Sequence, residues 1–497
     1  MYPRTNSWRP WFKNILALSD PLKAKMTYNK KLENISAGVL LVYLAAYFFV
    51  PYKPWQSPIS LHTPFLGLGL ILYFLRIFPD ILRGGFYFPR DLVFFTLAAV
   101  FFMISSGIVH CKEFSRQGVQ AYTISFLCFI FVRGAVRNLN LNALFFGMKV
   151  YLIVSGILIL LQIKFAGPFF VAGFGGQMNS GKGVPGWGFG NTLIWAGGAM
   201  AWMLSIILTR YALSCNEKSG IRARLFDLSA LGLGAIGLFY TLNRGAWVGM
   251  ALAMLLLSGI LIRAGLFQKS FLKGLAVLLF FVSVSAVVLR PNIYKMHEKL
   301  SFIKSFMHAD AYEISTKVPV ADKGSIAEKV SFMEGFPEKP RQLLANDAST
   351  LTRLRAWGVA LDGIKTHPFW GLGIGQFPGF YEKAFPRLFP GLEWWEFDPN
   401  TKQIPHNSYL YYSVEAGLLP AAFLFLFIII LLVNAFRLGV RAPVFPFFIG
   451  AVTLCVWILT CDYIIERIFW IALGLAAGFP PTARQNGQKT PGFIEHP

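Results

Sequence analysis

The chain has 497 residues, of which 55% are hydrophobic and only 14% are charged. A water-soluble protein of this size has a less apolar composition, so an ordinary soluble domain is excluded. The formal net charge of +22 can indicate a nucleic-acid partner. Here the basic residues instead follow the loops between apolar segments, and we expect no nucleic acid to bind.

Apolar residues fall into twelve blocks of about 16–25 residues, the length that a helix needs to cross hydrocarbon. Backbone groups in lipid must pair within their own segment, so each block predicts a helix. The sequence therefore predicts an all-α, polytopic membrane protein with about twelve transmembrane helices. The blocks are 33–50, 61–79, 91–110, 118–133, 141–163, 191–209, 225–242, 245–263, 271–289, 408–433, 443–461 and 463–479.

Basic residues are distributed unequally between the two sides of the predicted membrane. With a cytoplasmic N-terminus, the tails and inward loops carry 23 Lys and Arg residues, and the short outward loops carry six. Cytoplasmic loops of membrane proteins are enriched in Lys and Arg, so this bias sets the orientation. With twelve spans, both termini are predicted to be cytoplasmic.

One outward loop is much longer than the others. It covers 290–406 and carries 15 of the 46 Lys and Arg residues and 13 of the 24 acidic residues. Long loops of this kind are usually functional or disordered. The predicted organisation is a cytoplasmic tail, nine spans, the outward loop, three spans and a second tail, with bounds 1–32, 33–289, 290–406, 407–480 and 481–497.

The second half of this loop shows a helical pattern. Apolar residues recur at helical spacing over 351–366, and Ser349 and Thr350 are suitable N-cap residues. The pair His367-Pro368 is expected to end the helix, and the glycines within 371–375 are expected to form turns.

Several motifs that would indicate other chemistry are incomplete. The run Gly176–Gly183 resembles a phosphate-binding loop, but Gly183 stands where Ser or Thr is required. The pair His297-Glu298 lacks the second histidine of a zinc protease motif. The sequence contains no Asp-x-Asp pair, which a metal-chelated nucleotide-sugar donor would require. We therefore expect no metal and no cofactor.

Three residues on the outward side are candidates for chemistry. His406 lies where the long loop returns to the membrane, and Arg244 lies in an almost absent loop between two spans. An arginine at that depth is costly unless it is paired or faces a ligand. Arg353 lies on the predicted loop helix, one turn before Trp357. The structural alternatives are a histidine at a helix start, an interface arginine and a solvated arginine, respectively.

Three ordered motifs resemble a known family. The run Asn243-Arg-Gly-Ala-Trp247 is similar to the family's Ser-Arg-Gly-Ala-Trp motif. Arg353-Leu-Arg-Ala-Trp357 followed by Thr366-His-Pro-Phe-Trp-Gly-Leu-Gly373 is similar to its Arg-x-x-x-Trp…His-Pro-Leu-x-Gly-x-Gly pattern. Pro405-His-Asn-Ser-Tyr-Leu410 with Glu415-Ala-Gly417 is similar to its His-Asn-x-x-Leu…Glu-x-Gly signature. The ordered set resembles the O-antigen ligase and polymerase family of bacterial membrane glycosyltransferases.

The resemblance implies transfer of a glycan from a polyprenyl diphosphate, such as undecaprenyl diphosphate, to a sugar hydroxyl. The reaction would take place on the periplasmic face of the inner membrane, by a metal-independent inverting displacement. His406 would accept the proton, while Arg244 and Arg353 would stabilise the leaving diphosphate. Membrane lipids would surround the enzyme. The further substrate-binding candidates are Arg355, Lys182, Asn407, His367 and Trp357.

These further candidates also have structural alternatives. Arg355 is expected as a solvated side chain and His367 as a helix stop, and either Asn407 or Ser408 is expected to cap the helix that follows. Lys182 lies in a glycine-rich stretch that matches the family loosely. Trp357 belongs to the family motif.

The sequence leaves the acceptor open. A ligase transfers a finished polysaccharide to lipid A–core of lipopolysaccharide or a similar acceptor, and this is the favoured interpretation. A polymerase would extend an O-antigen or exopolysaccharide chain, and a protein O-oligosaccharyltransferase would modify a protein. Outside the family, a twelve-helix secondary transporter is the alternative, but the large outward loop has no partner in the first half of the chain. A non-catalytic envelope scaffold is a further alternative.

Overall fold

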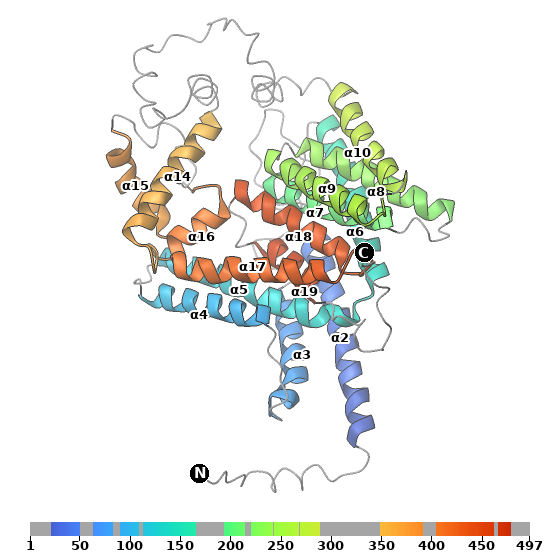
Figure 1. Cartoon of the computed structure of the whole chain (residues 1–497), viewed down its shortest axis with the longest axis horizontal. Helices are drawn as coiled ribbons and strands as arrows, with labels where there is room; N and C mark the ends of the chain where they lie inside the picture. The colour runs from blue at the N-terminus through green and yellow to red at the C-terminus, as the bar shows by residue number, and fades with distance from the viewer. Residues whose placement is uncertain are drawn as a thin grey trace, which may run out of the picture.

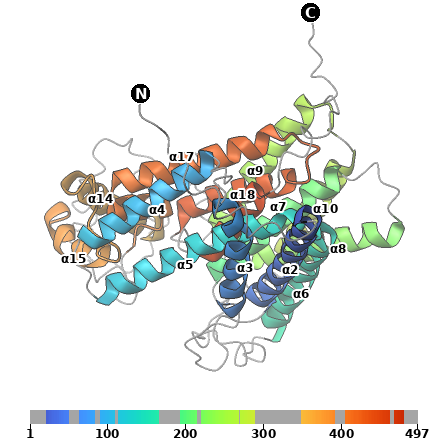
Figure 2. The ribbon, with the colours of Figure 1, turned by 90° about the horizontal axis from the view of Figure 1, so that it is seen from below.

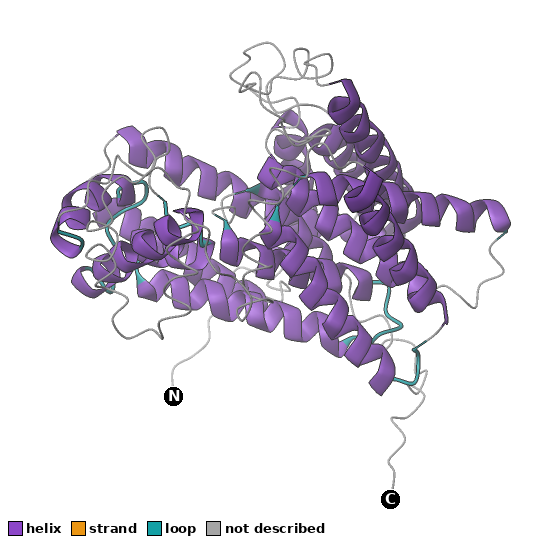
Figure 3. Cartoon of the chain, turned by 90° about the horizontal axis from the view of Figure 1, so that it is seen from above, coloured by secondary structure: helices purple, strands orange, loops and turns teal. Residues whose placement is uncertain are grey.

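The computed structural model of the chain describes residues 21–49, 63–82, 90–108, 113–165, 193–213, 220–241, 243–267, 269–288, 348–390, 404–461 and 466–478. Within these residues every regular element is a helix, as Figure 3 shows. The all-α prediction is therefore confirmed for the part of the chain that the structure describes.

Each of the first nine apolar blocks forms one helix. This includes the polar-interrupted block 118–133, which lies within α5 and is followed by the short 3-10 helix η2 (Val136–Asn138). The bounds of the nine helices are α2 (Pro21–Phe49), α3 (Thr63–Leu82), α4 (Arg90–Ile108), α5 (Glu113–Ala135), α6 (Leu141–Phe165), α7 (Leu193–Leu213), α8 (Ile221–Tyr240), α9 (Arg244–Arg263) and α10 (Lys269–Val288).

The tenth block was predicted as one helix, and this prediction is wrong. Residues 408–433 form α16 (Ser408–Ala416) and α17 (Leu418–Arg437), which are separated by Gly417. Gly417 has φ +95° and ψ 164°, a backbone conformation that glycine adopts almost exclusively. The last two blocks are helical over α18 (Phe445–Trp457) with the 3-10 helix η8 (Ile458–Thr460), and over α19 (Arg467–Ala477).

The number of membrane spans is only partly tested. Among the described residues, seven helices are long and apolar enough to cross a membrane, and four apolar helices are shorter. The 13 residues of α18 and the 11 of α19 extend for only ~20 and ~16 Å at 1.5 Å per residue. The chain is a multi-pass membrane protein, and twelve spans remain a prediction.

The membrane helices pack in two groups that α18 joins. In one group α17 packs against α4, and α19 packs against α5 and α17; in the other, α6 to α10 pack against one another. Helix α18 contacts α7 and α9 on one side and α17 and α19 on the other. Figures 1 and 2 show that α2 and α3 cross the direction of α4, α5 and α17.

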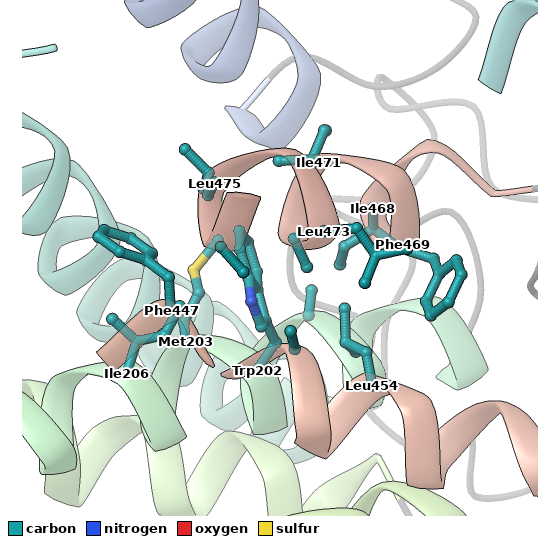
Figure 4. Packing of buried hydrophobic residues seen from close by; sticks show 14 of the residues in the cluster. Trp202, Met203, Ile206, Phe447, Leu454, Ile468, Phe469, Ile471, Leu473 and Leu475 are labelled. Carbon is teal, nitrogen blue, oxygen red and sulfur yellow. The ribbon is translucent and has the colours of Figure 1, made fainter. Parts of the chain in front are cut away.

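Large apolar side chains fill the interface between the two groups of helices. Trp202 of α7, Leu454 of α18 and Leu473 of α19 are fully buried there (Figure 4). Lipid tails are as apolar as these side chains, so water exclusion contributes little inside a bilayer. Close van der Waals packing must therefore supply most of the stabilisation of this interface.

Two helices of the long loop form a separate small core at one end of the molecule. Helix α14 (Ala348–Thr366) packs against α15 (Phe377–Leu388) and α16, as Figure 1 shows. The predicted helix 351–366 is confirmed, although it begins at Ala348, so Ser349 and Thr350 lie in its first turn and not at its N-cap. The buried residues of this core are Ala356, Val359, Ala360, Phe377, Tyr381, Ala384, Phe385, Phe389 and Val414.

We call residues 348–390, which contain α14 and α15, the loop unit. The loop unit contacts the membrane helices next to it. The Ser105 hydroxyl at the end of α4 donates a hydrogen bond to the Trp370 carbonyl at 2.6 Å. The Trp370 ring also lies 6.1 Å from the Phe101 ring, centroid to centroid. These contacts fix the segment after α14 at the end of the helical bundle.

Candidate active site

His406 lies in the turn that leads into α16. It is half-buried and has φ +50°, the only positive φ of a non-glycine residue in the described chain. Such conformations are uncommon, and histidine is among the side chains that tolerate them. The next residue, Asn407, is the N-cap, because its side-chain oxygen accepts hydrogen bonds from the Tyr409 and Leu410 amides, both at 3.1 Å. The predicted capping role of Asn407 is therefore confirmed.

Helix α14 is attached to the same turn. The Trp357 indole N–H donates a hydrogen bond to the Pro405 carbonyl at 2.6 Å. Arg353 lies four residues earlier on α14, ~6 Å along the helix axis. It therefore lies on the part of α14 next to the chain that leads to His406. Trp357 contributes its indole N–H to holding this turn, a function that the sequence pattern did not indicate.

The start of α9 reaches the same region through η8, which contacts both α9 and α16. Asn243 caps α9 by accepting a hydrogen bond from the Ala246 amide at 3.1 Å, and Arg244 is the first residue of the helix. A Cβ atom on Gly245 would lie 1.7 Å from the Thr460 hydroxyl oxygen, so α9 packs closely against η8 at this glycine. Arg244 is half-buried at this junction.

The residue after η8 connects this junction to α16. The buried Ser408 hydroxyl, two residues after His406, donates a hydrogen bond to the Cys461 carbonyl at 2.6 Å. Thr460 therefore contacts α9 while Cys461 contacts α16. The structure thus gathers the starts of α9 and α16, and through Trp357 the helix α14, around one turn of chain. Arg244, His406 and Arg353 are carried by these three segments.

A second set of contacts joins the far end of α16 to the chain after α14. The Leu372 and Gly373 amides donate hydrogen bonds to the Val414 and Glu415 carbonyls, both at 2.9 Å, and the Leu418 amide donates to the Pro368 carbonyl at 2.8 Å. We call these contacts between 368–373 and 414–418 the clasp. Gly371 has φ +69° and Gly373 has φ +96°, which confirms the predicted turns.

The clasp leaves no room for side chains at two glycines. A Cβ on Gly371 would lie 2.3 Å from the Glu415 carbonyl oxygen, and a Cβ on Gly417 would lie 2.1 Å from the Phe369 carbonyl oxygen. Helix α14 and the chain after it therefore contact both ends of α16. Trp357 contacts the turn before α16, and the clasp joins residues 368–373 to the C-terminal end of α16.

The expectation that Arg355 is a solvated side chain is wrong. Only 2% of Arg355 is exposed, because α15 covers this side of α14. Burial lowers the pKa of its guanidinium group, and the nearby Tyr381 phenol opposes this change. Burial also raises the pKa of Tyr381. Arg355 therefore lies in the small core of the loop unit, and its substrate-binding role remains a prediction.

His367 is not brought to the junction. His367 is exposed and directly follows α14, where its amide donates a hydrogen bond to the Gly363 carbonyl at 2.9 Å. It lies ten residues after Trp357, ~15 Å further along the helix direction. This position fits the predicted helix stop. Lys182 lies outside the described residues.

The described residues offer little for a metal ion. No group of three or more His, Cys, Asp or Glu side chains that would hold a metal occurs among them. The Glu415 carboxylate, at the far end of α16, accepts a hydrogen bond from the Phe377 amide. Metal-independent chemistry remains a prediction from the sequence.

Part of the chain matches a known protein family. A model of the O-antigen ligase family matches residues 229–425, from within α8 to the first part of α17. The match includes Arg244, Arg353 and His406 and the whole clasp. A search of curated proteins found no significant match. The resemblance seen in the sequence motifs is thus confirmed, and the chain carries in residues 229–425 a region of the O-antigen ligase family of membrane glycosyltransferases.

Proposed function

We propose that the protein is a ligase that transfers a glycan from a polyprenyl diphosphate to a hydroxyl group of lipid A–core or a similar acceptor. The reaction takes place on the periplasmic face of the bacterial inner membrane. The observation that supports this proposal is the set of contacts that links α14, through Trp357, and α9, through Thr460 and Cys461, to the segment that carries His406.

The proposed reaction is a single displacement. The acceptor hydroxyl attacks the anomeric carbon of the donor sugar while the bond from this carbon to the diphosphate oxygen breaks. His406 takes the hydroxyl proton and becomes imidazolium, since imidazole titrates near neutral pH. The bond electrons leave with the diphosphate, whose negative charge Arg244 and Arg353 stabilise through charge-assisted hydrogen bonds. The anomeric configuration is inverted.

Loss of either arginine is expected to lower transfer by about 10²–10³-fold, because each stabilises charge that develops in the transition state. The test uses purified protein in liposomes, a synthetic polyprenyl-diphosphate glycan and lipid A–core, with product separated by gel electrophoresis. Arg244→Ala is compared with Arg263→Ala at the opposite end of α9. Arg353→Ala is compared with Arg387→Ala on α15, whose exposed ion pair with Asp362 contributes little.

The two control variants are expected to keep wild-type rates. Equal activity in all four variants would refute the role of the arginines in diphosphate stabilisation. Full activity of the wild type with a second lipid-linked repeat as acceptor, and none with lipid A–core, would replace the ligase by a polymerase. The same distinction can be made in cells, where loss of a ligase leaves long polymer on the carrier lipid and loss of a polymerase leaves single repeats.

Chelation of divalent metals is expected to leave the transfer rate unchanged. The permanent charge of two guanidinium groups replaces the metal that other glycosyltransferases use to stabilise a diphosphate. The measurement is the initial rate of the liposome reaction with and without EDTA. Inactivation by EDTA that magnesium reverses would contradict metal-independent transfer.

A further inference from the structure

Glu415 is a buried carboxylate in the last turn of α16. Only 1% of the residue is exposed. One carboxylate oxygen accepts a hydrogen bond from the Phe377 amide at 3.3 Å, and its backbone carbonyl accepts one from the Gly373 amide at 2.9 Å. The residue therefore contacts both the turn segment after α14 and the start of α15.

The start of α15 requires an acceptor from elsewhere. Phe377 is its first residue, and the preceding Gln376 makes no side-chain capping hydrogen bond. The first amides of a helix have no partner within the helix, and they carry a partial positive charge. Pro378 has no backbone N–H, so the Phe377 amide is the first N–H group without a partner within the helix at the N-terminus of α15. A carboxylate at this end satisfies that amide and interacts favourably with the helix dipole.

Through α15 this contact reaches α14. Phe377 and Tyr381 of α15 pack with Ala356 and Val359 of α14 in the small core of the loop unit. Ala356, which packs against α15, directly precedes Trp357 in α14. The indole N–H of Trp357 donates the hydrogen bond that holds the turn before α16. Displacement of α15 would therefore change how α14 lies along α16.

We propose that Glu415 is a positioning residue that caps α15 from α16 and so aligns α14, with Arg353, beside His406. This inference rests on the proposed function in so far as Arg353 and His406 act on the same substrate. Glu415 exchanges no proton in this role. An oxygen acceptor at position 415 is what the contact requires.

The kinetic test compares Glu415→Gln with Glu415→Ala. Glutamine keeps an oxygen that accepts the Phe377 hydrogen bond, and alanine removes it. We expect Glu415→Gln to stay within about threefold of the wild-type kcat, and Glu415→Ala to lose about 100-fold in kcat, since a small misplacement of reacting groups costs about this much. A folded Glu415→Gln protein as inactive as Glu415→Ala would overturn the proposal, because the charge itself would then be required.

A distance measurement tests the alignment without using activity. Spin labels are placed on exposed residues of α14 and α17, at Lys365→Cys and Leu426→Cys, in a background without the five native cysteines. Pulsed electron paramagnetic resonance measures the distance between the two labels. We expect one narrow distance distribution in the unsubstituted background and in Glu415→Gln, and a shifted or broader distribution in Glu415→Ala.

The two measurements separate the two proposals. A changed distance distribution in Glu415→Ala with no transfer activity in the unsubstituted protein would refute the proposed function and leave the alignment role standing. An unchanged distribution in a folded Glu415→Ala protein would refute the alignment role, whatever the activity. If Glu415→Ala does not fold, Glu415→Gln alone decides, through its kcat and its distance distribution.

Discussion

Replacing His406 with glycine is expected to lower the rate of glycan transfer by about 10²–10⁴-fold, the usual contribution of a general base. Glycine is the informative substitution because position 406 has φ +50°. Alanine there would add backbone strain, whereas glycine adopts this conformation without cost. Loss of activity in His406→Gly is therefore attributable to the missing imidazole. The measurement is the initial rate in the liposome reaction, together with the thermal unfolding midpoint in detergent.

Added imidazole gives this prediction its control. Glycine leaves space where the ring was, so free imidazole is expected to restore part of the activity of His406→Gly. Asparagine also tolerates a positive φ but fills part of this space, so His406→Asn is expected to stay inactive and to respond little. Wild-type rates in a folded His406→Gly protein would remove His406 from the proposed reaction.

Gly417→Ala is expected to destabilise the loop unit and to abolish transfer. Its backbone conformation costs about 1–3 kcal/mol for a residue with a side chain. The new Cβ would also lie 2.1 Å from the Phe369 carbonyl oxygen, so the clasp must open. Without the clasp, α14 keeps its contact with α16 through Trp357 and the core packing but loses the backbone hydrogen bonds at its C-terminal end. Thermal unfolding in detergent and the transfer rate measure the two effects.

Gly439→Ala is the matched control for this substitution. Gly439 has φ +88°, close to the +95° of Gly417, but nothing lies within 4 Å of its Cβ position. It should therefore show the backbone strain alone, as a lower unfolding midpoint with transfer retained. If the two variants behaved alike, the clasp would add nothing beyond the strain of a positive φ.

The helices were the most predictable part of the molecule. Apolar blocks identify them because lipid allows only paired backbone, and even the polar-interrupted block 118–133 is helical. The break at Gly417 was not predictable, since a single glycine in an apolar run is usually tolerated. The Phe369 carbonyl, which lies against Gly417 in the folded chain, is distant from it in the sequence, so no local pattern shows this contact.

The candidate site was predictable in its residues and less so in its construction. The three ordered motifs named Arg244, Arg353 and His406, but no pattern showed that Ser408 would bind the Cys461 carbonyl. Arg355 was misjudged because its burial depends on α15, a helix that its own segment does not indicate. Glu415 appeared in a motif without a role, since its partner Phe377 precedes it by 38 positions.

The clasp limits how this region can be exchanged with that of a relative. Its backbone hydrogen bonds join residues 368–373 to residues 414–418, so each segment supplies hydrogen-bond partners for the other. A chimera that takes residues 348–390 from a relative and keeps residues 404–418 of this chain would combine two segments whose contact surfaces come from different proteins. We expect hybrids to accumulate and function only when residues 348–390 and 404–418 are exchanged together, because the backbone contacts between them are then preserved.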